Sequence, residues 1–379
     1  MNIMKKTKST IGSKIPFVNL RKQYRGIKKE IDGAIKEVLG KGQFVLGDQV
    51  NQFEKEFARY CGSKYAIGVA SGTDALELSL RALGVKEGDE VITAPNSAVA
   101  TAMAILAVGA KPVFVDIESG TLNINPELVE RSITSKTKVI LPVHLFGNPA
   151  EMDKILKIAK KHKLAVIEDA CQAHGAKYLA KKAGTWGKMG CFSFYQTKNL
   201  GAYGDGGAVV TNDKRLYKIL LALRQYGWNE KKESEMFGRN SRLDEIQAAV
   251  LRVKLRHLND WTQKRRQIAK SYGRLLKKTP LKLPTENGFH VFHLYVVQTP
   301  LRNKLKSFLE KRGIKTTVHY PVIIPSQPYF SKLGYKNNCC PEAEKINSKI
   351  LSLPIYPEMT TTEVKKICQT IKEFFKIKI

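Results

Sequence analysis

The chain has 379 residues, of which 43% are hydrophobic and 26% charged, and these fractions exclude collagen-like, coiled-coil and wholly disordered proteins. Lysine and arginine (64) outnumber aspartate and glutamate (34), which gives a formal net charge of +30. Because the basic residues recur on nearly every polar segment, a general basic surface is the favoured interpretation. Attraction of anionic small substrates comes second, and nucleic-acid binding comes last.

The length predicts two domains, and the first alternates helices with strands. Apolar residues at helical spacing predict helices over 21–38, 47–61, 74–83, 99–107 and 152–162. Short apolar runs predict strands over 65–70, 90–94, 111–115, 139–143, 165–168, 190–194 and 207–211. This alternation is typical of an α/β domain with a mostly parallel sheet, which we assign to residues 1–255.

The pattern changes near residue 240. A stretch without glycine or proline predicts one long helix over 243–272, which would join the two domains. Beyond it, the chain predicts strands over 291–297 and 315–319, and helices over 301–311, 341–350 and 361–376. These sparser elements predict a smaller α+β domain over 256–379, packed tightly on the first because no Gly/Ser-rich linker separates them.

The cysteines and apolar runs indicate where the protein resides. No apolar run reaches the roughly 18–20 residues needed to cross a bilayer, and the basic N-terminus lacks the apolar core of a secretory signal. The six cysteines form no C-x-x-C pair and no zinc-finger spacing, so we expect no metal site. The sequence therefore predicts a cytoplasmic protein with free thiols and no membrane span.

Three segments place polar groups next to apolar runs. Ser71-Gly72-Thr73 lies between a predicted strand and a predicted helix, and a helix start is a ready phosphate site. Asp169 follows one apolar strand, and Lys198 follows another and precedes a glycine-rich loop. Each segment has an ordinary alternative: a plain capped helix for the first, a helix N-cap for Asp169 and a solvated turn lysine for Lys198.

Together the three segments match the groups that hold pyridoxal 5'-phosphate. Its phosphate needs an anion site, its pyridine nitrogen needs a carboxylate to stay protonated, and its aldehyde needs a lysine amine. The chain resembles the nucleotide-sugar aminotransferases of the DegT/DnrJ/EryC/StrS type, which use this cofactor on the aspartate-aminotransferase fold. The resemblance runs from Pro16 to Pro357 and is carried by segments such as ASGTDAL, VIEDACQAHGA, SFYQTKNLGAYGDGGAV, GRNSRLDEIQAAVLRVKL and VHYP.

The resemblance implies a role for three residues at the cofactor ring. Lys198 forms the Schiff base with the cofactor and then moves the proton between the two reacting carbons. Asp169 pairs with the pyridine nitrogen, and Gln172 contacts the 3-oxygen side of the ring. Ala98 stands where the family often has an aromatic residue that stacks on the ring, so stacking is expected from elsewhere or is weaker.

The resemblance also implies how the phosphate and the sugar substrate are held. The phosphate is held by Gly72, Thr73 and Ser193. Asn240 reaches the phosphate of the neighbouring subunit, which implies a homodimer with shared active sites. His319 and Tyr320 lie where the family lines its sugar-nucleotide cleft, and a packed strand histidine is the alternative for His319.

The implied reaction is a ping-pong transamination with L-glutamate as the amino donor and pyridoxamine 5'-phosphate as the intermediate form of the cofactor. The segment LRQYGWNEKKESEMFGRNSRLDE looks most like members that aminate C3 of a dTDP-linked 3-keto-6-deoxyhexose. C4 amination of a UDP- or GDP-linked 4-keto-6-deoxyhexose is the alternative. A cofactor-binding regulator without turnover, which Lys198 and Asp169 disfavour, and a basic nucleic-acid-binding protein are the other classes.

Overall fold

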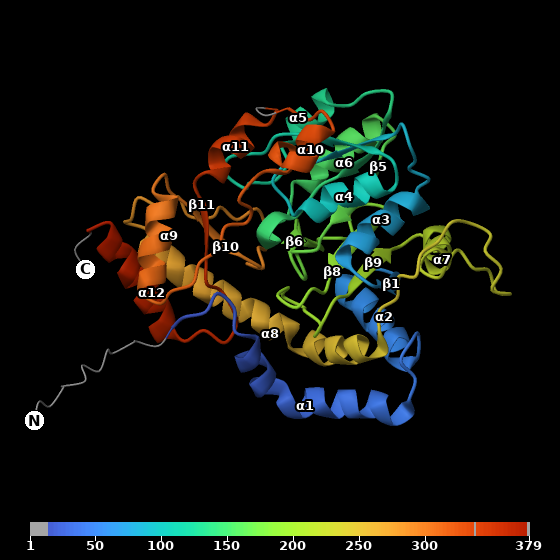
Figure 1. Cartoon of the computed structure of the whole chain (residues 1–379), viewed down its shortest axis with the longest axis horizontal. Coiled ribbons are helices and arrows are strands. Elements are labelled where there is room, and N and C mark those ends of the chain that lie inside the picture. Colours follow the sequence, from blue (N-terminus) through green and yellow to red (C-terminus); the bar gives the residue numbers. More distant parts are fainter. Residues whose placement is uncertain (1–13, 337–338, 377–379) are drawn as a thin grey trace, which may run out of the picture.

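The computed structural model describes residues 14–336 and 339–376, which fold around a seven-stranded sheet (Figure 1). The strand order is β1-β9-β8-β5-β4-β2-β3. The strands are β1 (Tyr65–Val69), β2 (Glu90–Thr93), β3 (Lys111–Phe114), β4 (Thr137–Leu141), β5 (Ala165–Asp169), β8 (Met189–Ser193) and β9 (Gly207–Thr211). β9 is antiparallel to both neighbours and the other pairs are parallel, which confirms the predicted α/β fold with a mostly parallel sheet.

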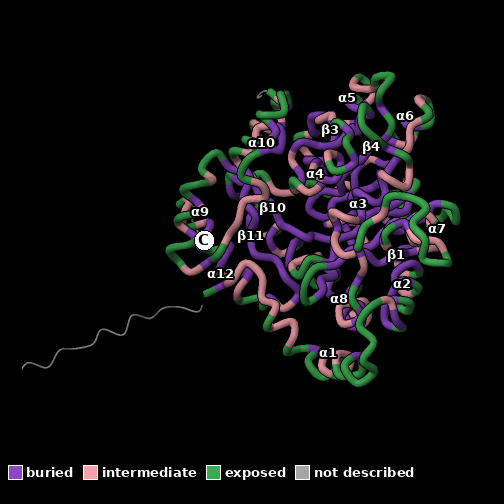
Figure 2. Tube along the Cα trace, turned by 45° about the vertical axis from the view of Figure 1, so that its right-hand side comes forward, coloured by how far each residue is buried: buried purple, intermediate pink, exposed green. Residues whose placement is uncertain are grey.

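Helices cover both faces of this sheet because successive strand residues point to opposite sides. The covering helices are α2 (Asp48–Cys61), α3 (Gly72–Ala82), α4 (Val99–Ala107), α5 (Pro126–Arg131), α6 (Met152–Lys161), α7 (Lys214–Leu223) and α8 (Glu245–Leu276). On one face, Val209 packs with α3, α4 and α7. On the other face, Phe192 packs with α2 and α8, and Ile140 packs with α5 and α6. Figure 2 shows the buried residues concentrated between these layers.

A small antiparallel sheet of β10 (Tyr295–Gln298) and β11 (Ile350–Leu353) lies near the C-terminal half of α8. The helix reaches both sheets because Leu251, in its first half, packs in the core of the large sheet, and Tyr272, in its second half, packs with the small one. The small sheet is also covered by α9 (Arg302–Lys311) and α12 (Thr361–Phe374), and α1 (Leu20–Lys41) lies along α8.

Short elements complete the described part of the chain. They are β6 (Lys177–Tyr178), β7 (Lys181–Lys182), α10 (Pro328–Lys332), α11 (Pro341–Asn347) and the 3-10 turns η1 (Leu145–Gly147) and η2 (Ile324–Ser326). Among the residues that the structure describes, every helix is too short or too polar to traverse a bilayer.

Two predictions for the C-terminal part are wrong, and a third, the strand over 291–297, is displaced because β10 begins only at Tyr295. The strand predicted over 315–319 is not formed, because this extended segment touches β11 only through a single bridge between Thr317 and Ser352. The helix predicted over 341–350 ends at Asn347, since Ile350 begins β11 and pairs with Gln298. In both places the partner on a distant strand decides the structure.

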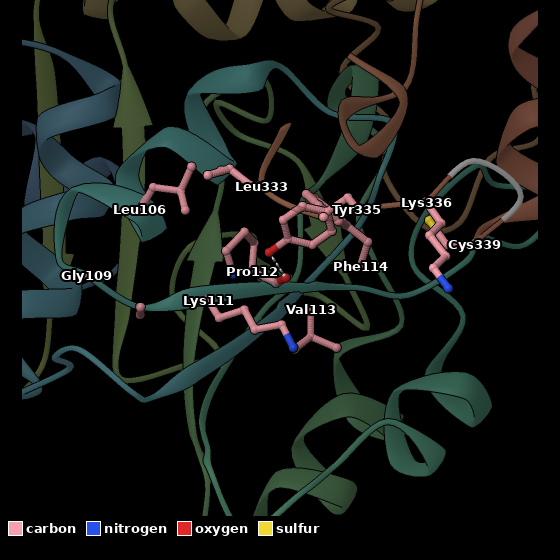
Figure 3. Close-up of a pocket in the computed structure, with 12 residues that line it drawn as sticks. Leu106, Gly109, Lys111, Pro112, Val113, Phe114, Leu333, Tyr335, Lys336 and Cys339 are labelled. Carbon is pink, nitrogen blue, oxygen red and sulfur yellow. Dashed lines mark hydrogen bonds between the residues drawn. The ribbon is translucent and has the colours of Figure 1, made fainter. Parts of the chain in front are cut away.

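One edge of the large sheet is protected by two side chains (Figure 3). Pro112, within the edge strand β3, has no N–H to offer a neighbouring strand. Its carbonyl oxygen accepts a hydrogen bond from the Tyr335 hydroxyl at 2.7 Å. A surface cavity of about 590 Å³, lined mainly by apolar side chains, lies beside them. Pro112 and Tyr335 therefore hinder the pairing of another chain with this edge.

Two of the buried histidines, His174 and His290, pack against phenylalanine rings. His174 packs against Phe192 and Phe194, with ring centroids 5.4 and 5.8 Å away. His290 stacks on Phe292, and its Nδ1 accepts the backbone N–H of Phe292 at 2.9 Å. Burial is the main cause that lowers the pKa of each ring from 6.5 to about 3. In both rings the protonated form is strongly disfavoured in the folded protein.

We expect stability to fall as the pH drops from 6.5 toward 3, because the unfolded chain then binds a proton at His174 and at His290 and the folded chain does not. The stabilising contribution is complete above the unfolded pKa. Each histidine should change the free energy of unfolding by about 1.4 kcal/mol per pH unit within this window. Urea unfolding of the wild type and of His174→Leu at several pH values measures the difference in slope. Equal slopes for the two proteins would contradict the prediction.

Candidate active site

The candidate site lies at the carboxyl ends of the parallel strands of the large sheet, where β1, β5 and β8 end. β1 leads into Ser71 and α3, β5 ends at Asp169, and β8 ends at Ser193. These three strands run in the same direction, so their carboxyl ends share one edge. Together with Lys198, from the loop after β8, these residues line a cavity of about 290 Å³.

The cavity contains most of the residues that the sequence singled out. Six of them line it: Gly72, Thr73, Asp169, Gln172, Ser193 and Lys198. The sequence predicted no role for several other residues that line the cavity, namely Ser97, Thr101, Cys171, Tyr195 and Asp205. Ser97 and Thr101 belong to the same APNSAVAT segment as Ala98, so the position of that segment next to the ring was the available signal.

The start of α3 provides a site for an anion. The Ser71 side chain accepts the backbone N–H of Asp74 at 3.1 Å and so caps the helix. The N–H groups of Gly72 and Thr73 come first in the helix and have no acceptor within it. A Cβ atom on Gly72 would lie 2.6 Å from Ser193 Cβ, so glycine allows α3 to begin this close to β8. The positive end of the helix dipole therefore faces the cavity beside several donors.

Asp169 presents a fixed carboxylate to the cavity. Its Oδ2 accepts a hydrogen bond from Thr101 Oγ1 at 2.8 Å, and its Oδ1 accepts the backbone N–H of Cys171 at 3.2 Å. The residue is 5% exposed. The N-cap alternative for Asp169 is wrong, because residues 170–176 form turns and not a helix.

The neighbouring acid, Glu168, points away from the cavity and has a structural role. Its carboxylate is fully buried and accepts the backbone N–H groups of Gly184, Trp186 and Gly187 at 2.6 to 2.7 Å. His144 Nε2 lies 2.9 Å from the same carboxylate, and Nδ1 of that ring accepts the N–H of Ala150. Four donors therefore satisfy Glu168, which leaves Asp169 to face the site.

Lys198 carries an amine that no hydrogen bond or ion pair joins to the described residues. Burial is the main cause that lowers its pKa from 10.5, while Cys171 and Asp169 nearby act in the opposite direction. The backbone N–H of Lys198 donates to the carbonyl of Tyr195 at 2.8 Å, and Lys254 Nζ donates to the carbonyl of Gly201 at 2.6 Å. The loop is therefore anchored, and burial shifts the amine toward its neutral, nucleophilic form.

The amide of Gln172 forms two hydrogen bonds at the rear of the cavity. Its Oε1 accepts the backbone N–H of Phe146 at 2.7 Å, and its Nε2 donates to the Tyr320 hydroxyl at 3.1 Å. Tyr320 does not line the 290 Å³ cavity itself but contacts the site through Gln172. Burial is the main cause that raises the pKa of the Tyr320 hydroxyl above its usual range, so the hydroxyl stays protonated.

His319 and Asn240 are not brought into this cavity. His319 Nδ1 lies 2.9 Å from Ser352 Oγ, and burial lowers the pKa of the ring to about 4. Asn240 is exposed and forms a backbone bridge with Gln225. Asn240 is therefore not among the residues of its own chain that line the cavity with Lys198.

The groups in the cavity fit pyridoxal 5'-phosphate. The helix start offers donors for a phosphate, Asp169 offers a carboxylate held by two protein donors, and Lys198 offers an amine without a protein partner. These are the three partners that the phosphate, the pyridine nitrogen and the aldehyde of the cofactor require. A phosphate ion alone would make no favourable contact with Asp169, because both groups are negatively charged.

Comparison with known proteins matches residues 25–372 to the model of the DegT/DnrJ/EryC1/StrS aminotransferase family. The chain is 45% identical to the dTDP-3-amino-3,6-dideoxy-alpha-D-galactopyranose transaminase of Aneurinibacillus thermoaerophilus, over 95% of this chain and 99% of that protein. It is also 45% identical to a Geobacillus stearothermophilus protein named pleiotropic regulatory protein, over 96% and 99%. A third relative, 41% identical over 96% and 98%, is the UDP-N-acetyl-3-dehydro-alpha-D-glucosamine 3-aminotransferase of Acidithiobacillus ferrooxidans.

Two solved structures share the fold. The structure of DesV from S. venezuelae matches with a TM-score of 0.94 and 41% identity, over 97% of this chain and 100% of that one. The structure of ntda from Bacillus subtilis with bound cofactor PMP matches with a TM-score of 0.90 and 34% identity, over 98% and 87%. Both likenesses cover nearly the whole chain, so they include the cavity and the smaller sheet.

Proposed function

Because this chain belongs to the DegT/DnrJ/EryC1/StrS aminotransferase family, and is thus a sugar aminotransferase that uses pyridoxal 5'-phosphate, we propose that it aminates C3 of a dTDP-linked 3-keto-6-deoxyhexose with L-glutamate as donor. The names of two relatives place the amino group at C3 of the sugar, which is a dTDP-sugar for one and a UDP-sugar for the other. C4 amination of a UDP- or GDP-linked 4-keto-6-deoxyhexose is the alternative. The net charge of +30 is compatible with a diphosphate-bearing substrate in either case.

The observation that carries the proposal is the meeting of three groups in one cavity. Gly72 and Thr73, with Ser193, would hold the phosphate through backbone N–H groups and a hydroxyl. Asp169 would hold the protonated pyridine nitrogen. When bound, the cofactor supplies a ring that accepts the electron pair released at the amino-bearing carbon. Lys198 would bind the aldehyde carbon and, once displaced by the amino donor, carry the proton between the two carbons.

The lowered pKa of Lys198 supports both of its proposed roles. An amine must be neutral to attack a carbonyl carbon or to remove a proton, and burial favours that neutral form. Cys171 and Asp169 act in the opposite direction and favour the protonated amine, the form that returns a proton to carbon.

Further residues complete the proposed site. Gln172 would contact the 3-oxygen side of the ring, and its hydrogen bond to Tyr320 supports placing Tyr320 beside the substrate. His319 would line the sugar-nucleotide cleft as a neutral ring, which can either donate or accept a hydrogen bond. We also propose that residues 1–255 and 256–379 form two domains, whose boundary falls within α8.

The proposed active unit is a homodimer in which each site is shared. Asn240 would reach the phosphate bound by the neighbouring subunit, which agrees with its exposure and its absence from the lining of its own cavity. Large apolar side chains are exposed on segments near Asn240 and Lys198: Tyr195, Tyr203, Tyr226, Met236 and Phe237. A second copy of the chain would remove them from water.

Nitrogen-15-labelled L-glutamate tests the proposed function. The purified protein, loaded with cofactor, is mixed with the labelled donor and either a dTDP-linked 3-keto-6-deoxyhexose or a UDP-linked 4-keto-6-deoxyhexose. We expect the label at C3 of the dTDP-sugar, located by NMR of the isolated product. Label at C4 of the UDP-sugar alone would favour the alternative. A protein that fails to take the label from glutamate onto its cofactor would contradict transamination altogether.

A further inference from the structure

A chain of two hydroxyl groups ends on the Asp169 carboxylate. Thr101 Oγ1 donates to Asp169 Oδ2 at 2.8 Å, and Ser97 Oγ lies 3.1 Å from Thr101 Oγ1. Ser97 and Thr101 are 2% and 1% exposed; Ser97 lies just before the N-cap of α4, and Thr101 lies in the first turn of that helix. These hydrogen bonds therefore connect α4 to the carboxyl end of β5, among residues that line the cavity.

The direction of these hydrogen bonds follows from the chemistry of the groups. An ionised carboxylate can only accept hydrogen bonds, so the Thr101 hydroxyl must be the donor to Asp169. The oxygen of Thr101 is then free to accept from Ser97. Each donor in such a series of hydrogen bonds polarises the next, which strengthens the contact with the carboxylate.

Asp169 has two protein donors, from different elements. Cys171 N–H, in the turn after β5, holds Oδ1, while Thr101, on α4, holds Oδ2. The backbone donor is present whatever side chain stands at position 171. The side-chain donor depends on Thr101 alone, so Thr101 decides whether the plane of the carboxylate is fixed at both oxygens.

We propose that Thr101 is a positioning residue for the cofactor, acting through Asp169, and that Ser97 orients it. This inference rests on the proposed function, because it assumes that Asp169 holds the pyridine nitrogen. Thr101 keeps the carboxylate aimed into the cavity before the cofactor binds. Without its hydroxyl, part of the binding free energy is used to order the Asp169 side chain.

The chain offers a matched control in Thr93. It is also fully buried, and its Oγ1 donates a hydrogen bond of 2.9 Å, but to the backbone carbonyl of Leu141 within the sheet. Thr93→Val and Thr101→Val remove the same atom from equally buried sites. The two variants therefore share the structural cost and differ in whether a carboxylate in the cavity loses a donor.

The experiment measures the dissociation constant of pyridoxal 5'-phosphate for the wild type, Thr101→Val, Thr101→Ser and Thr93→Val, with thermal unfolding to confirm that each is folded. We expect Thr101→Val to bind the cofactor about tenfold more weakly, which is the effect of one charge-assisted hydrogen bond. Thr101→Ser, which keeps the hydroxyl, should restore affinity to within about twofold, and Thr93→Val should bind as the wild type does.

Two results would overturn the inference. The first is wild-type affinity in a folded Thr101→Val protein. The second is an equal loss from Thr101→Val in the wild type and in Asp169→Ala, because a residue acting through the Asp169 side chain must lose its effect when that side chain no longer accepts its hydrogen bond. If Thr101→Val does not fold, Thr101→Ala in the same cycle gives the answer. Failure of the wild type to aminate any keto sugar would refute the proposed function, but it would leave this comparison of affinities unaffected.

Discussion

Replacing Lys198 with alanine is expected to lower the rate of amino transfer by at least about 10³-fold, because one change removes both the nucleophile and the proton carrier. The cavity holds no second lysine among its lining residues, so no other amine can take over. The affinity for the cofactor should fall far less, since the α3 start and Asp169 remain in place.

The first half-reaction with L-glutamate isolates this effect, because it needs no sugar substrate. Cofactor-loaded wild type, Lys198→Ala and Lys198→Arg are mixed with glutamate, and the absorbance of the bound cofactor is followed in single turnover. Arginine keeps a positive charge but no neutral amine, so it should fail as alanine does. Lys181→Ala, an exposed lysine on β7, should react as the wild type does. A rate within about tenfold of the wild type for Lys198→Ala would contradict the assigned role.

The sequence predicts the large sheet well because its strands are short apolar runs between helices. β9 and α4 have the predicted bounds, and β2 and β3 differ from them by one residue at the end. The missing elements divide into two kinds. α7 has an N-cap in Asp213 and apolar residues at positions 216, 220 and 223, so its signal was present in the sequence. β11 was not predictable in this way, since its four residues become a strand through pairing with β10, about 50 residues earlier.

The candidate site was predictable where a strand end delivers the residue directly. Asp169 and Ser193 end β5 and β8, and Gly72 begins α3 after β1, so parallel strands bring them together at one edge. Thr101 could not be assigned in the same manner, because its contact with Asp169 joins residues 68 positions apart. Glu168 shows the converse: adjacent to Asp169 in sequence, it points to the opposite face and binds a loop.

Replacing Asp169 with asparagine is expected to lower the rate of amino transfer by about 10²- to 10³-fold while the cofactor still binds. Asparagine has nearly the same shape, and its amide oxygen can still accept the Thr101 hydroxyl. It has no negative charge, however, so the pyridine nitrogen loses the partner that keeps it protonated. A neutral ring withdraws electrons less strongly, and the release of the proton at the amino-bearing carbon slows accordingly.

Two controls separate this electrostatic effect from a general disturbance of the cavity. Asp205→Asn makes the same change in another carboxylate that lines the cavity, at an exposed position, and should cost far less. A cofactor analogue methylated at the ring nitrogen carries a permanent positive charge, so it should restore part of the rate in Asp169→Asn and none in Lys198→Ala. Single-turnover absorbance with L-glutamate measures each combination. Equal losses in the Asp169 and Asp205 variants, without rescue by the methylated cofactor, would mean that the charge of Asp169 is not what the reaction requires.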